Sequence, residues 1–255
     1  MAVGINNERS ETHEGLVLGA ISTAFASIAL IYSFADVSGA HFNPAVTFAT
    51  VVAGKVSVRK GLLYVGIQLI AATAATVWLY AVSPANRSLS PVEQVIVTLH
   101  GDASVGHAFM MDILVYVIFA TAFDQVDTSN TQTVTLPDGT IKDSTIGRHL
   151  TIYTTNANTK AGFAPFAIGF TLGFLCFLGG SVSGGAFNPA RVFGPSLVSG
   201  NWEWHWMYWL ADFLGGAAAG VVQKFFAHKA IANAGQTVGT IKSGAEAGAA
   251  SDARR

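Results

Sequence analysis

One twelve-residue segment occurs twice in the chain, and this duplication constrains the fold more than any other feature. Residues 37–48 read VSGAHFNPAVTF and residues 182–193 read VSGGAFNPARVF, with eight of the twelve positions identical. Proline is favoured at the first position of a helix, and asparagine before it is a good helix cap. Each copy is therefore predicted to begin a short helix at its Asn-Pro-Ala triplet, which comprises Asn43, Pro44 and Ala45 in the first copy and Asn188, Pro189 and Ala190 in the second.

The surroundings of these triplets are apolar. Of the 255 residues, 51% are hydrophobic and only 11% are charged, whereas a soluble domain carries about 25% charged residues. This composition predicts that most of the surface faces membrane lipid. The net charge of −1 argues against a nucleic-acid partner. The single cysteine and the scattered histidines predict no internal disulfide and no metal site.

Apolar stretches long enough to cross a bilayer of about 30 Å occur five times, whereas those that follow the two Asn residues are too short to cross. The sequence therefore predicts an all-α membrane protein with five spanning helices and two re-entrant half-helices. The expected spans are Leu16–Ala35, Leu62–Val82, His107–Gln125, Phe163–Gly180 and Trp206–Ala227, and the half-helices are Asn43–Val52 and Asn188–Val198.

Three expected spans lie between the two copies, so the copies should enter the membrane from opposite faces. This is an inverted repeat, and such a repeat places its functional site near the membrane midplane. Each half-helix would point the positive end of its dipole at that centre. Asn43 and Asn188 could offer amide hydrogens there to a passing water or hydroxyl, and two positive helix ends would repel cations and protons.

The chain divides into a polar N-terminal segment (1–14), a membrane domain (15–228) and a tail (229–255) that is expected to be disordered. A polar loop at 127–160 contains the turn signal Pro137-Asp138-Gly139 and is a candidate for a small hairpin. The distribution of lysine and arginine predicts that this loop and the C-terminus are cytoplasmic. Asn86 begins a glycosylation sequon on the opposite side.

With these features, the chain resembles the aquaporin, or major intrinsic protein, family from about Leu16 to Ala227. The resemblance rests on the segments SGAHFNPAVTF, SGGAFNPARVFGPS and HWMYW. It implies a passive channel, not an enzyme, that needs no cofactor and has one pore in each subunit of a homotetramer. The partners would be water, small uncharged solutes and membrane lipid, in the plasma membrane or an organelle membrane.

The resemblance also assigns roles to individual residues. It implies that Asn43 and Asn188 are the pore asparagines and that Arg191 belongs to an outer constriction, the selectivity filter. The remaining filter positions would be Thr23, Cys176 and Gly185. His41 would line the cytoplasmic vestibule, and Asp112 would take the place of a buried glutamate that braces a pore loop.

The expected solute is left open by this pattern. Thr23 and Cys176 are smaller than the aromatic and histidine residues of strict water channels, which favours a filter wide enough for glycerol, urea or hydrogen peroxide. Val192, Ser196 and the Tyr208-Trp209 pair instead resemble the water-selective branch. Asp212 stands where the family often has proline, and the sequence gives no reason for that exchange.

The family has one more helix before the span that leads into the first triplet, and residues 1–14 are too polar to supply it. Three explanations are open: an incomplete gene model, a genuine five-span variant, or an artificial truncation. The alternative function that follows is a non-conducting, structural or junctional membrane protein. An ion-coupled transporter would need acidic residues at the midplane, and the assigned pore positions carry none.

Overall fold

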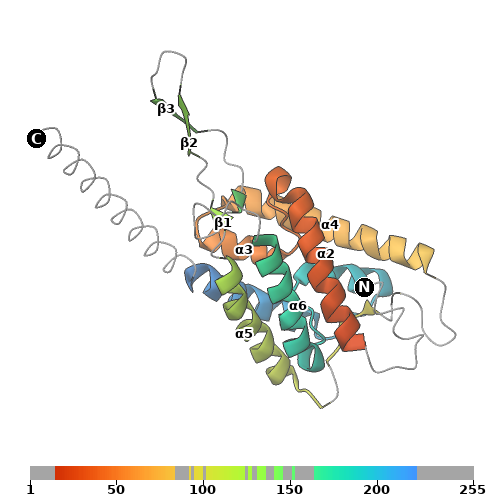
Figure 1. Ribbon diagram of the computed structural model, residues 1–255. Coiled ribbons are helices and arrows are strands. Elements are labelled where there is room, and N and C mark those ends of the chain that lie inside the picture. The colour runs from red at the N-terminus through yellow and green to blue at the C-terminus, as the bar shows by residue number, and fades with distance from the viewer. Residues whose placement is uncertain are drawn as a thin grey trace, which may run out of the picture.

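Long helices form most of the computed structural model, and two half-helices lie among these long helices (Figure 1). The long helices are α2 (Gly15–Ser38), α4 (Val58–Val82), α5 (Val105–Phe123), α6 (Ala164–Ser183) and a last helix at residues 205–222, and the half-helices are α3 (Pro44–Val52) and α7 (Pro189–Ser199). The structure describes residues 15–83, 92, 95–99, 102–123, 126–127, 131–135, 141–145, 151–152 and 164–222.

The order of these helices confirms the predicted inverted repeat. Long helix, half-helix and long helix follow one another in α2–α3–α4 and again in α6–α7–205–222. Helices α4, α5 and α6 lie between the two half-helices, and this odd number of spans makes the half-helices enter from opposite faces. Within the described residues, α2, α4 and α6 are each long and apolar enough to cross a membrane.

Glycines allow the helices to approach one another closely, as is usual in membranes. A Cβ atom at Gly169 of α6 would lie 2.9 Å from the Ala24 carbonyl oxygen of α2, and one at Gly173 would lie 3.1 Å from the Ala20 carbonyl oxygen. A side chain at Gly169 would require a shift of the neighbouring backbone and one at Gly173 would be unusually tight, so α2 and α6 pack backbone to backbone. Their contact forms one wall around the site.

The half-helices are clamped in the same way by their neighbours. A Cβ atom at Gly216 of the 205–222 helix would lie 2.8 Å from the Ala45 carbonyl oxygen of α3. One at Gly194 of α7 would lie 2.6 Å from the Ala72 carbonyl oxygen of α4. Each half-helix is thus fixed against a long helix of the other repeat.

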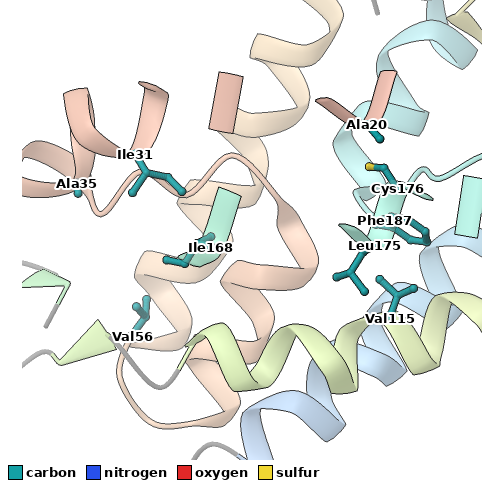
Figure 2. Packing of buried hydrophobic residues seen from close by; sticks show 9 residues of the cluster. All are labelled: Ala20, Ile31, Ala35, Val56, Val115, Ile168, Leu175, Cys176 and Phe187. Carbon is teal, nitrogen blue, oxygen red and sulfur yellow. The ribbon is translucent and has the colours of Figure 1, made fainter. Parts of the chain in front are cut away.

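Buried apolar side chains connect these elements (Figure 2). They come from α2, α5, α6 and the segments on either side of the half-helices, and they include Phe187, which precedes the second triplet. The nine residues are Ala20, Ile31, Ala35, Val56, Val115, Ile168, Leu175, Cys176 and Phe187. The cluster packs the loop that carries Asn188 against the helices around it.

Short strands follow α5 in the region predicted as a polar loop. Strand β2 (Thr131–Thr135) pairs with β3 (Ile141–Thr145) in antiparallel register, with Thr131 opposite Thr145. Strands β1 (Val126–Asp127) and β4 (Thr151–Ile152) form a second antiparallel pair. Figure 1 shows the β2–β3 hairpin projecting away from the helices. The Pro137-Asp138-Gly139 turn, the two terminal segments and Asn86 lie outside the described residues.

Large apolar side chains cover the outside of the molecule. Ile70 and Trp78 of α4 are each 71% exposed, which suits a surface in contact with lipid acyl chains. Trp202, Trp204 and Trp206 are also exposed near the start of the 205–222 helix. Tryptophans concentrate at membrane–water interfaces, so these three mark one membrane boundary.

Candidate pore site

The two triplets cap the half-helices as predicted. The Asn43 side chain accepts a hydrogen bond of 2.9 Å from the Ala45 N–H at the start of α3. The Asn188 side chain accepts hydrogen bonds from Ala190 N–H at 3.0 Å and Arg191 N–H at 3.3 Å at the start of α7. In both copies the cap uses the side-chain carbonyl oxygen, which leaves the amide hydrogens free to bond elsewhere.

Those amide groups tie the two loops to each other. The Asn43 Nδ2 donates to the Phe187 carbonyl oxygen at 2.6 Å, and the Asn188 Nδ2 donates to the Phe42 carbonyl oxygen at 2.9 Å. Each acceptor is the residue just before the opposite asparagine. The two half-helix starts therefore meet, joined by a reciprocal pair of hydrogen bonds across 144 and 146 residues of chain.

Backbone strain accompanies this arrangement. Phe187 has a φ of 43° and Ala40 a φ of 51°, in the left-handed region that residues with a side chain rarely adopt. Such strain costs about 1–3 kcal/mol and persists where the surroundings enforce it. The Phe187 side chain is 2% exposed within the apolar cluster, so packing holds this residue in place while its carbonyl faces Asn43.

A tyrosine makes the two asparagines unequal. The Asn43 Nδ2 also donates to the Tyr116 hydroxyl oxygen at 3.2 Å, and that hydroxyl donates to the Phe187 carbonyl oxygen at 2.6 Å. Both amide hydrogens of Asn43 are therefore taken by protein atoms. Asn188 has one such bond within the described residues, which leaves one hydrogen for another partner. Both asparagines were expected to offer amide hydrogens to a passing molecule, and among the described residues the structure leaves one free only on Asn188.

The predicted filter residues come together from three elements. The Cys176 thiol of α6 lies within hydrogen-bonding reach of the Thr23 hydroxyl of α2 and close to the Arg191 guanidinium of α7. Gly185 lies beside them, because a Cβ atom there would sit 3.7 Å from the Cys176 carbonyl oxygen. The Arg191 Nη1 is buried and has no hydrogen-bond partner among the described residues, so its charge is available to a pore molecule.

His41 lies in the loop that enters α3, two residues before Asn43. Its Nδ1 is 3.2 Å from the Thr47 hydroxyl, and the Gln68 Nε2 donates to the His41 carbonyl oxygen at 2.8 Å. Burial, with a smaller contribution from the nearby Lys60 charge, lowers the pKa of His41 to about 4. The imidazole is therefore neutral at physiological pH.

Gln68 and Tyr116 are the site residues that the sequence analysis missed. Gln68 had a detectable signal, because a polar amide within an apolar span is a candidate functional residue. It is 7% exposed on α4 and also donates to the Thr47 hydroxyl at 2.9 Å. Tyr116 gave no such signal, because a tyrosine in an apolar helix is usually a packing residue.

Asp112, the predicted loop brace, is fully buried on α5. It lies near Ser183, the last residue of α6, but neither of its carboxyl oxygens has a hydrogen-bond partner within the described residues. Tyr116, one helical turn further on, gives α5 a direct hydrogen bond to that loop through the Phe187 carbonyl oxygen, and the bracing role of Asp112 stays a prediction.

Comparisons with known proteins identify related sequences over most of the chain. The model of the family described as "Major intrinsic protein" matches residues 1–143 and 144–223. Aquaporin-B of Dictyostelium discoideum is 58% identical over 221 residues, which cover 82% of this chain and 71% of the relative. The probable aquaporin TIP3-2 of Arabidopsis thaliana is 34% identical, with coverage of 85% and 69%.

A solved structure shares the fold. The aquaglyceroporin of Plasmodium falciparum superposes with a TM-score of 0.62 at 17% identity, covering 89% of this chain and 87% of that chain. The family model and the relatives indicate one family, and the structural match and the reciprocal asparagine bonds fit its fold. The chain belongs to the major intrinsic protein family, as an aquaporin-like, multi-pass membrane channel for water or small solutes and not an enzyme.

Proposed function

We propose that each chain encloses its own pore, which passes water and also small neutral solutes of the size of glycerol, urea or hydrogen peroxide. The observation that carries this proposal is the meeting of the two half-helix starts, where Asn43 and Asn188 hold each other's loops. Polar groups are costly to bury in apolar surroundings, and a path for polar molecules would explain why they are placed there.

The mechanism follows from charge and hydrogen bonding at that meeting point. Each half-helix directs the positive end of its dipole toward the centre, which disfavours cations and protons. The spare amide hydrogen of Asn188 can donate to the oxygen of a passing water or hydroxyl. A molecule held by such a donor keeps its oxygen toward the asparagine, and this interrupts a chain of waters that could otherwise carry protons.

The small size of the filter side chains supports the wider set of solutes. Thr23 and Cys176 have small side chains that interact with each other, the Cys176 thiol lies close to the Arg191 guanidinium, and Gly185 contributes no side chain. A guanidinium with an unsatisfied Nη1 can bind a hydroxyl or a carbonyl oxygen as readily as a water. The filter would thus select for small neutral molecules with hydrogen-bond acceptors.

We further propose that the chain assembles as a homotetramer in lipid, with its C-terminus in the cytoplasm. The exposed apolar side chains on α2, α4 and α6 support contact with lipid and with neighbouring subunits. Cross-linking of the reconstituted full-length protein tests the assembly: a ladder that ends at four subunits supports it, and a ladder that ends at one or two contradicts it.

Permeability of reconstituted vesicles tests the channel itself. Vesicles with the full-length protein should shrink faster than empty vesicles in an impermeant osmolyte, and they should swell again in glycerol. Asn188→Ala should abolish most of both rates. Equal water permeability with and without protein would favour the non-conducting, structural function instead.

The filter assignment has its own test. Thr23→Phe should block glycerol while water passage survives, because an aromatic ring narrows the space beside Cys176 and Arg191. Mercurial reagents should inhibit the wild type and not Cys176→Ser. Glycerol passage that is unchanged in Thr23→Phe would show that the constriction lies elsewhere.

A further inference from the structure

Two carboxyl groups lie buried between α5 and the 205–222 helix. Asp112 and Asp212 are each 0% exposed. None of their four carboxyl oxygens makes a hydrogen bond of regular geometry within the described residues, although the Ser183 hydroxyl lies close enough to Asp112 to interact with it. Buried polar atoms are nearly always hydrogen-bonded, so these four oxygens require an explanation.

Helix packing places the two residues at the same level. Ala108 of α5 packs with Tyr208 of the 205–222 helix in one cluster. Further along both helices, a Cβ atom at Gly215 would lie 3.1 Å from the Ile113 carbonyl oxygen. Later residues of α5 thus contact later residues of the 205–222 helix, which means that the two helices run parallel. Residues 112 and 212 therefore lie side by side, and their carboxyl groups interact electrostatically.

The groups around this pair do not neutralise it. Tyr116 on α5 and Tyr208 on the 205–222 helix interact with both acids. Arg191 on α7 and Glu203 in the turn before the last helix interact with Tyr208. Arg191 interacts with Cys176 and Tyr208, and α6 contributes the uncharged Ser183. The described residues place no cation in contact with the pair, and two adjacent buried carboxyl groups without one cannot both be ionised.

We propose that Asp112 and Asp212 share a bound proton, and that this acid pair positions the pore loop between α6 and α7. One carboxylic acid donates its O–H to the carboxylate of the other, a strong type of hydrogen bond. Asp212 is thus a positioning residue, which acts through Asp112 and touches no pore molecule. The positioning role rests on the channel function proposed above.

Two hydrogen bonds connect the pair to the pore loop. Tyr208 lies one helical turn before Asp212 and donates to the Ser183 carbonyl oxygen at 3.0 Å. Tyr116 lies one turn after Asp112 and donates to the Phe187 carbonyl oxygen at 2.6 Å. The pair therefore holds the two helices that grip the loop at both ends. When alkaline pH removes the shared proton, two negative charges repel each other and the loop loses its fixed position.

Infrared spectroscopy of the reconstituted full-length protein tests the shared proton without any need for transport. The wild type should show the carbonyl stretch of a protonated carboxylic acid at neutral pH, shifted in heavy water. Asp212→Asn and Asp112→Asn should each shift or remove this band, because each replacement changes the partner of the remaining acid. Asp102→Asn, at an exposed site in the turn before α5, should leave the band unchanged and is the matched control.

Two infrared results would overturn the proposal. One is a wild-type spectrum without a protonated-carboxyl band at neutral pH. The other is a band that keeps its position and intensity in Asp212→Asn, which would mean that the two acids are independent. Either result leaves the channel function standing, since the vesicle assay measures that function separately.

The pH profile of water permeability tests the positioning role. Wild-type permeability should fall reversibly by about threefold or more at alkaline pH, as like charges appear in the buried pair. Asp212→Asn should match the wild type at neutral pH and lose the alkaline fall, because the amide donates to Asp112 without a titrating proton. An unchanged alkaline fall in Asp212→Asn, or a flat profile in the wild type, would contradict it.

Discussion

Asn43 and Asn188 begin matching half-helices from matching sequences, but their surroundings differ. Asn43 is buried and gives both amide hydrogens to protein atoms, one of them to Tyr116. Asn188 is partly buried and gives one hydrogen to the Phe42 carbonyl oxygen. The duplicated sequence thus sets the same local cap twice, while a residue of α5 decides which asparagine keeps a donor for the pore.

The largest expected effect separates the two asparagines. Asn188→Ala should lower water permeability about tenfold, because it removes the spare donor and adds a barrier of roughly one hydrogen bond. Asn43→Ala should cost more stability, about 3 kcal/mol against about 2 kcal/mol for Asn188→Ala, because it loses a cap and two further hydrogen bonds. Stopped-flow light scattering and thermal unfolding in detergent measure the two quantities. If Asn43→Ala and Asn188→Ala lose the same permeability and the same stability, the two asparagines are equivalent and the proposed difference is wrong.

The clamps on the two half-helices provide the next test. Gly216→Ala and Gly194→Ala should each destabilise the protein by about 1–3 kcal/mol, because the added methyl group meets a backbone carbonyl oxygen that cannot yield easily. Gly66→Ala is the control, since its Cβ atom would meet nothing within 4 Å. A loss in Gly216→Ala alone would mean that α3 is clamped and α7 is not.

A smaller effect is expected when the tyrosine hydroxyl is removed. Tyr116→Phe frees one amide hydrogen of Asn43, so water permeability should rise about twofold while stability falls by about 1 kcal/mol. Tyr80→Phe, on the exposed surface of α4, is the matched control and should change neither. Permeability that falls in Tyr116→Phe would show that the hydroxyl holds the loop more than it occupies the donor.

The smallest effect concerns His41. Its pKa is lowered to about 4, so the imidazole stays neutral above that pH and gains its charge only below it. Water permeability of the wild type should therefore be flat through pH 6.5, where an unperturbed histidine titrates. His41→Gln should have the same flat profile. An inflection near pH 6.5 in the wild type that His41→Gln removes would contradict the neutral state of this partly buried imidazole.

Features that depend on nearby residues were predictable from the sequence. The half-helices begin at Pro44 and Pro189, because the cap and the proline are read directly from each triplet. Helix α4 begins at Val58 and not at the predicted Leu62, since Ser57 caps it by accepting from the Lys60 N–H. The long side chains of Arg59 and Lys60 can extend to the interface, so their charges do not end the helix.

Features that depend on helix rotation were not predictable. The bond between Tyr116 and Asn43 spans 73 residues, and no local pattern indicates which face of α5 meets the first loop. The same applies to Asp212, which stands where the family often has proline. The sequence gives no reason for this exchange, whereas the structure places the helix of Asp212 beside Asp112. The filter positions were assigned from the family resemblance. The structure places these residues near one another, and their role as a filter stays a prediction.

The reciprocal bonds between the two loops have a mechanical consequence. Asn43 holds the residue before Asn188, and Asn188 holds the residue before Asn43. Neither loop can be displaced alone, because a pull on one is transmitted to the other through both bonds. The two half-helix starts therefore behave as a single rigid unit, so any change that frees one loop must also release the other.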